Sequence, residues 1–273
     1  MADLPAHATV VVGVDGSQAA IHAVLWAVDE ALARDLPLRL VHVRPTEPTV
    51  GPPSLAVPLG VEYAETVLRK AHAAILASGK AVKVDTAILE GDPTSVLLTE
   101  SRNAELVCIG STGIGVVARR VLGSKATALA EAVHCPIAII RERDADEDAD
   151  RRWIAVAVKP SIDDEDIVVA ALEEARLRRT PLLAIGLWDK DFGFTPYDEL
   201  DRLLEEWRQR YPDVHVHPAT TRSGLAHFLA QEHVLIDLVV VGAGDARLLA
   251  QIVGPHGHQI VEHSECSVLI VRH

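Results

Sequence analysis

Short apolar runs, rich in β-branched residues, alternate along this chain with longer stretches in which apolar residues recur at helical spacing. In its first half, the apolar runs predict strands near residues 9–14, 37–43, 82–89, 105–110 and 136–141. The helical spacing, seen clearly in Ala20, Ala23, Val24, Ala27 and Ala31, predicts helices near residues 17–34, 61–78, 93–102 and 124–133. Nearly continuous apolar strands are typical of a parallel sheet covered by helices on both faces. We therefore predict a doubly wound α/β domain with five parallel strands.

The second half of the chain repeats this order of elements. Four of its apolar runs match runs of the first half in order: Trp153–Val158, Pro181–Leu187, Leu238–Gly242 and Glu265–Val271. Residues 142–152, between the halves, are mostly charged and carry no apolar side chain larger than Ala, which is typical of a linker. We predict two tandem five-stranded domains of one α/β fold, 1–141 and 153–273, joined by an acidic linker at 142–152.

The most specific motif lies in residues 110–124. Gly110 and Gly113 are separated by two residues, Gly123 follows after nine more, and Ser124 stands where a helix is expected to begin. Glycine lets backbone approach a ligand closely, and serine is a good helix N-cap. A strand, a glycine-rich loop and a helix N-terminus together form an anion site of backbone N–H groups. The motif therefore predicts a phosphate-bearing ligand and favours a nucleotide.

This spacing resembles the ATP-binding signature of the universal stress protein family. The resemblance covers residues 9–141 and includes Asp15-Gly16-Ser17 after the first strand, Gly91-Asp92-Pro93 before the third helix, and the strands at 40–43 and 134–140. It implies an adenine nucleotide alpha-hydrolase-like, Rossmann-like fold that binds ATP with Mg²⁺. It also implies a nucleotide-dependent sensor or regulator in stress response.

The resemblance implies a role for each matching residue. Gly13 and Val14 would shape the base pocket, Asp15 would lie near the adenine and ribose, and Val43 would offer backbone groups to the adenine edge. Gly91 would let the chain pass close to the ribose. The phosphates would be held by Gly110, Ser111, Thr112, Gly113, Gly115, Gly123, Ser124 and Lys125.

Some of these residues have simpler interpretations. Asp15 is also suited to closing a turn, because Asp-Gly-Ser is turn chemistry. Gly115 could act as a spacer only. Thr112 stands where many relatives carry a basic residue, a departure that weakens the expected grip on phosphate.

The second half departs from the motif at its key positions. Lys159-Pro160 replaces Asp15-Gly16, Asp245 occupies the place of Gly113, and Pro255 replaces Ser124. A carboxylate aimed at phosphate repels it, and Pro lacks a backbone donor. We predict that the second half binds ATP poorly or not at all.

Other functions are less well supported. A slow ATPase or a phosphoryl- or adenylyl-transfer enzyme on the same site would need a positioned base, and no catalytic residue is identifiable. A non-nucleotide interaction module is the other alternative. Gly113–Ala118 also fits a dinucleotide fingerprint but follows the fourth strand instead of the first. A metal site near His215, His217 or the histidines around Cys266 lacks a paired-ligand motif, so we assign none.

The composition limits the possible partners and the cellular compartment. The net charge of −13 argues against nucleic-acid partners, and no apolar run is long enough to cross a membrane. Hydrophobic residues make up 49% of the chain but aromatic ones only 4%, so a large aliphatic core is expected. The three cysteines fall in or beside predicted buried strands and fit reduced thiols, which with the lack of a signal peptide favours the cytoplasm. Relatives associate through the last strand of each half, so we expect such pairing between the halves and a homodimer, besides an unidentified regulatory protein partner.

Overall fold

The computed structural model describes residues 8–46, 53–111, 124–141, 152–158, 165–187, 196–222, 224–231, 235–244 and 266–272. The chain divides into two compact units, unit 1 (Met1–Glu142 with Arg272–His273) and unit 2 (Arg143–Val271). The predicted domain limits remain a prediction, because most of the linker lies outside the described residues.

Unit 1 alternates strands with helices. Its elements in chain order are β1 (Thr9–Gly13), α1 (Gln18–Ala33), β2 (Leu38–Arg44), α2 (Pro53–Ala77), β3 (Val84–Glu90), α3 (Pro93–Glu100), β4 (Ala104–Gly110), α4 (Ser124–Ala132) and β5 (Ile137–Ile140). The strands follow the spatial order β3-β2-β1-β4-β5, and neighbouring strands are parallel. This confirms the predicted doubly wound α/β fold. The largest boundary error is at α2, which was predicted from residue 61 but begins at Pro53 and continues through Pro58 and Gly60. Proline is favoured at the first helical position, where its missing N–H is not needed.

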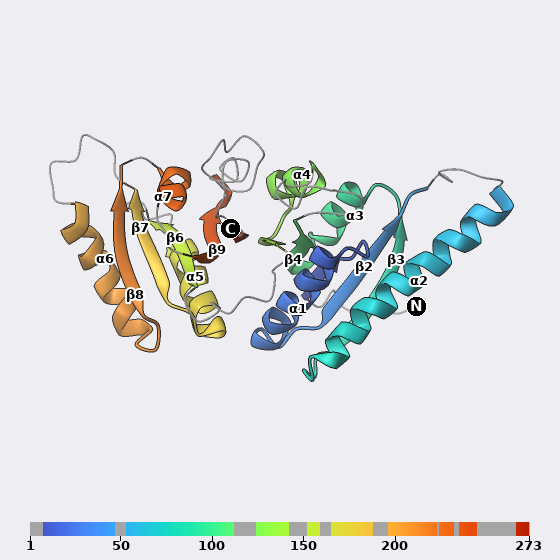
Figure 1. Cartoon of the computed structure of the whole chain (residues 1–273), viewed down its shortest axis with the longest axis horizontal. Helices are drawn as coiled ribbons and strands as arrows, with labels where there is room; N and C mark the ends of the chain where they lie inside the picture. The colour runs from blue at the N-terminus through green and yellow to red at the C-terminus, as the bar shows by residue number, and fades with distance from the viewer. Residues whose placement is uncertain are drawn as a thin grey trace. The chain divides into compact units, whose positions relative to one another are not determined.

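Helices cover both faces of this sheet. Figure 1 shows α1 and α2 on one face, where they pack on each other, and α3 and α4 form a second pair. The strand interiors are almost fully buried and aliphatic, as in Val10, Val12, Leu38, Leu40 and Leu106. The predicted Ala/Val/Leu/Ile core is therefore confirmed, and this core fixes where the strands end.

Charged pairs hold β3 against β2. Arg39 lies directly opposite Asp85 in the register and forms an ion pair with it, and its Nε also donates to Glu100 of α3 at 2.8 Å. Burial opposes the charged form of Arg39, yet the pKa of this guanidinium is raised because Glu100 and Asp85 outweigh that effect. Arg44 and Glu90 form a second opposite pair. These pairs fix the register of the end strand, since a slip of one residue would place each charge on the other face.

Unit 2 repeats the arrangement. Its described elements are β6 (Trp153–Val158), α5 (Glu165–Arg178), β7 (Leu182–Leu187), α6 (Pro196–Arg210), β8 (Val216–Thr221), α7 (Leu225–Gln231), β9 (Ile236–Gly242) and β10 (Ser267–Val271). The strand order is β8-β7-β6-β9-β10, again parallel. The register shift between Thr9 and Val10 of β1 recurs between Trp153 and Ile154 of β6. The two units thus share both the strand order and the register shift in their first strand.

The cysteines behave as the sequence predicted. Cys108, Cys135 and Cys266 are all buried, and none of the three forms a disulfide. Within the described ranges, no helix combines the length and apolar character that a membrane span requires.

Candidate functional site

The candidate site lies at the carboxyl edge of the unit 1 sheet. The chain continues from β1 to β2 and β3 on one side and from β4 to β5 on the other, so the order reverses between β1 and β4. Ligands of open α/β sheets bind beyond the strand ends at such a switch point. Asp15 follows β1, Val43 is the penultimate residue of β2, and Gly110 ends β4. The structure therefore brings these three predicted residues to one edge.

Asp15 forms the turn that leads into α1. Its Oδ1 accepts the backbone N–H of Ser17 at 2.9 Å, and Gly16 adopts φ 94°, a left-handed conformation that favours glycine. Ser17 then caps the helix by accepting the N–H of Ala20 at 3.1 Å. The turn interpretation of Asp15 is thus correct, and it fixes the carboxylate beside the N-terminus of α1.

Val43 presents its backbone toward the candidate site. In a parallel ladder alternate residues point their N–H and C=O groups to the same side, and the carbonyl of Val41 accepts from Val14 N–H at 2.9 Å. Val43 therefore faces the β1 side as well. The last register pair of these strands is Gly13 with Val41, so Val43 lies beyond the end of β1. This orientation is the one that the predicted contact with an adenine edge requires.

A buried histidine and an exposed tyrosine line the same edge, and sequence reasoning missed both. His42 is only 7% exposed, and its Nδ1 lies 2.7 Å from the carbonyl oxygen of Val14, which requires the proton on Nδ1. The His42 ring meets that of Tyr63 edge to face, with centroids 5.9 Å apart. Tyr63, 48% exposed, donates its hydroxyl to the carbonyl of Asp15 at 3.2 Å. The available signal was His42 as the one polar residue in the run Leu40–Val43.

Gly110 and Ser111 have packing roles that the sequence did not show. A Cβ on Gly110 would lie 2.8 Å from backbone atoms of Ala19 and Ala20, so only glycine lets β4 end against the first turn of α1. The N–H of Ser111 donates to the carbonyl of Ile140 at 2.8 Å, and Ser111 is 3% exposed. That N–H is engaged in the sheet, so a phosphate cradle would have to be formed by the residues that follow.

The rest of the predicted cradle is only partly described. Thr112, Gly113, Gly115 and Gly123 lie outside the described residues. Ser124 and Lys125 begin α4, and their side chains lie outside the description as well. The structure thus describes the two ends of the glycine motif, β4 and α4.

Gly13 and Gly91 are the remaining predicted site residues that the structure describes. A Cβ on Gly13 would lie 3.0 Å from Leu97 of α3, so glycine allows that helix to pack closely. Gly91 has φ +140° and donates its N–H to the carbonyl of Arg44 at 2.9 Å. Asp92 then caps α3 by accepting the N–H of Ser95 at 2.9 Å. Gly91 therefore turns the chain from β3 into α3 at the same edge. Arg44 lies beside this turn and is a largely buried cation, which the sequence reasoning did not single out.

The corresponding edge of unit 2 differs. The register aligns Val10 with Ile154 and Leu38 with Leu182, which places Ala157 at the position of Gly13 and Gly186 at that of His42. Lys159, Pro160, Asp245 and Pro255, on which the prediction of a weak second site rests, lie outside the described residues. No group of three or more His, Cys, Asp or Glu side chains that could hold a metal ion occurs in the parts of the chain that are described.

The two units are Rossmann-like α/β units of the adenine nucleotide alpha-hydrolase type, with a candidate ligand edge in unit 1. A family model described as "Universal stress protein family" matches residues 7–141 and 157–272. The chain belongs to the universal stress protein family.

Two of the similar proteins match nearly the whole chain, and a third matches half of it. Universal stress protein Rv2624c of Mycobacterium tuberculosis is 45% identical over 269 residues, 98% of this chain and 97% of the relative. A crystal structure of a universal stress protein from Archaeoglobus fulgidus has a TM-score of 0.67 at 18% identity, with 97% of this chain and 96% of that chain covered. A universal stress protein solved in complex with cAMP is 25% identical over 50% of this chain and 98% of its own, with a TM-score of 0.40.

Proposed function

We propose that unit 1 binds ATP with Mg²⁺ at the carboxyl edge of its sheet and that the chain is a nucleotide-dependent sensor or regulator in stress response. One observation carries the proposal: the ends of β1, β2 and β4 meet beside the N-terminus of α1, and the glycine motif 110–124 connects β4 to α4. The same edge binds ligands in open α/β sheets generally.

The described residues fit an adenine nucleotide. Val43 would bind the adenine edge through its backbone, and the Asp15 carboxylate, held by Ser17, would face the ribose. The motif residues 112–123, with Ser124 and Lys125, would hold the phosphates through backbone N–H groups and one mobile positive charge. Mg²⁺ commonly uses substrate phosphates, water and one or two carboxylates, so it needs no dedicated cage of protein ligands.

The regulatory part of the proposal concerns what the nucleotide changes. Phosphates bound to residues 112–123 would fix the surface that this loop presents, and a partner protein would recognise that surface. We propose that the chain acts as a homodimer in the cytoplasm, where the three buried thiols, none of them in a disulfide, stay reduced. Light scattering at micromolar concentration tests the dimer, and a monomer there contradicts it.

The first experiment identifies the nucleotide. The purified full chain is denatured, and the released nucleotide is identified and counted by chromatography, followed by titration of nucleotide-free protein with Mg-ATP, Mg-ADP, AMP and cAMP. We expect about one ATP per chain, because the unit 2 sequence lacks the motif. No released nucleotide and no binding in the titration would contradict the proposal and favour an interaction module.

A pair of reciprocal variants assigns the site to a unit. Gly113→Asp gives unit 1 the residue of unit 2, and Asp245→Gly makes the opposite change. We expect Gly113→Asp to abolish nucleotide binding by like-charge repulsion and Asp245→Gly to leave the stoichiometry unchanged. Equal loss in both variants would argue against a single site in unit 1.

A further inference from the structure

The outer edge of β3 exposes backbone groups that could pair with another strand. β3 ends the strand order of unit 1, and its described neighbour in the sheet is β2. Leu38 N–H donates to the carbonyl of Lys83, and Gly91 N–H donates to the carbonyl of Arg44, so the odd-numbered residues from 83 to 91 face β2. Because this orientation alternates, the N–H and C=O groups of Val84, Thr86 and Ile88 point away from the sheet.

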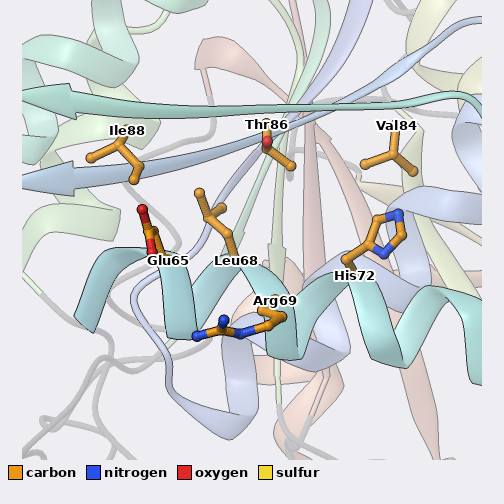
Figure 2. A pocket seen from close by; sticks show the side chains of 7 residues that line it. All are labelled: Glu65, Leu68, Arg69, His72, Val84, Thr86 and Ile88. Carbon is orange, nitrogen blue, oxygen red and sulfur yellow. The ribbon is translucent and has the colours of Figure 1, made fainter. Parts of the chain in front are cut away.

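The same three side chains line a hollow of about 590 Å³ between β3 and α2. Figure 2 shows Leu68 directed at the strand from the middle of the helix, with Glu65 toward Ile88 and His72 toward Val84. The floor is apolar, since Leu68 is nearly buried and Val84 and Ile88 are half-buried. Glu65, Arg69 and His72 stand on its exposed rim. A strand added to β3 would point alternate side chains into this hollow.

Unit 2 closes the equivalent edge with proline. The registers of β2 with β3 and of β7 with β8 place Pro218 at the position of Thr86. Leu182 N–H donates to the carbonyl of His215, so Pro218 also faces outward, and the donor it lacks is one of the edge donors. Proline on an edge strand is a common protection against unwanted pairing. β3 has neither a proline nor a bulge along its seven residues.

We propose that the β3 edge and the α2 hollow bind an extended peptide segment of a partner protein by strand addition. The outward backbone groups select an extended backbone, and the hollow selects apolar side chains at alternate positions. Glu65 near Ile88 favours a basic residue at that end of the peptide, whereas the His72 ring near Val84 can donate a hydrogen bond and so favours a carboxylate there. The surface is separate from the proposed nucleotide site and does not depend on it.

The test is a peptide selection on the full chain. A displayed library of random peptides of about ten residues is selected on the wild type, and the peptides obtained are synthesised and titrated by fluorescence anisotropy. We expect alternating apolar residues, and an affinity about tenfold lower for Thr86→Pro, since one edge hydrogen bond is lost. Thr86→Val keeps the N–H and is expected to bind like the wild type.

Two further variants keep the test decisive if Thr86→Pro fails to fold. Glu65→Lys reverses an exposed charge on α2 and His72→Glu introduces one, neither touching the strand. We expect Glu65→Lys to select an acidic residue at the Ile88 end of the peptide and His72→Glu to select a basic residue at the Val84 end. Amide hydrogen exchange adds a direct readout, because bound peptide should slow exchange at Val84, Thr86 and Ile88.

Three outcomes would overturn the proposal. The first is a selection that yields no binding peptide. The second is a set of peptides that bind wild type and Thr86→Pro equally and whose binding is unchanged in Glu65→Lys and His72→Glu. The third is a wild-type dimer that Thr86→Pro converts to a monomer while no peptide is selected, which would make this edge a contact between copies of the chain.

Discussion

Units 1 and 2 share structural details far from the carboxyl edges of their sheets and differ at those edges. In α1 the buried Glu30 accepts from Arg34 at 3.1 Å, and Asp35 follows with a left-handed φ of 53°. The corresponding residues of α5 are Glu174, Arg178 and Arg179, with an ion pair of 2.9 Å and a φ of 54°. A left-handed non-glycine residue is uncommon, so its recurrence at one place indicates a repeated scaffold.

The carboxyl edges of the two sheets differ in sequence within that scaffold. At the positions of Gly13 and His42 unit 2 has Ala157 and Gly186, so it lacks the histidine that bonds the end of the first strand. The comparison teaches that the fold requires the buried strands and the C-terminal end of the first helix of each unit, whereas the residues at the strand ends are free to change. The predictions below test that separation.

The largest effect is expected at the glycine that ends the fourth strand of each unit. Gly110→Ala would place a Cβ 2.8 Å from backbone atoms of α1, which cannot move without shifting the helix, so we expect a loss of about 3 kcal/mol. Gly242→Ala meets the flexible end of Ile167 instead, at 2.6 Å, and we expect about 1 kcal/mol. Urea unfolding of the full chain measures both, and equal losses would contradict the distinction.

Most of the fold was predictable because its signals are local. Strands such as β1 and β4 are continuous apolar runs bounded by turn residues, and their ends fell within one or two positions of the prediction. The start of α2 was missed because Pro58 and Gly60, which lie inside the helix, are residue types that normally end one.

The site was predictable only where its residues belong to a motif. The pattern located Asp15 and Gly110, but not the contact of Gly110 with α1 or the bond from Ser111 to Ile140, because both depend on distant segments. His42 and Tyr63 were missed for the same reason, since 20 residues separate them and only the packing of α2 on β2 brings the rings together.

A second effect concerns the thiols that precede the last strand of each unit, Cys135 and Cys266. Burial raises the pKa of Cys135 from 9.0 to about 11, so at pH 8 its thiolate fraction is about a hundredfold below that of an unperturbed thiol. We expect iodoacetamide to modify Cys135 at least that much more slowly in the folded chain than in urea, with mass spectrometry resolving the site. Equal rates in both conditions would contradict the burial.

The next largest effect is expected at His42, the histidine that unit 1 has and unit 2 lacks at the carboxyl edge of the sheet. His42→Leu replaces the buried imidazole with an apolar side chain and leaves the Val14 carbonyl without its donor, so we expect a loss of about 2 kcal/mol in unfolding free energy. The control is Tyr63→Phe, which removes an exposed hydrogen bond and is expected to cost less than about 0.5 kcal/mol. If the two variants unfold at the same urea concentration, His42 does not hold the strand end as described.

The smallest effect should be the same in both units. Asp35 and Arg179 adopt a left-handed conformation that strains any residue with a Cβ, whereas glycine accepts it. Asp35→Gly and Arg179→Gly should therefore each stabilise the chain by about 0.5 to 1 kcal/mol, the conformational relief being partly offset by the greater entropy of unfolded glycine. Thermal unfolding of the two single variants and the double variant checks this, and the two gains should add because the sites lie in different units. A gain in one unit and a loss in the other would show that the shared backbone conformation is held by different forces in the two copies.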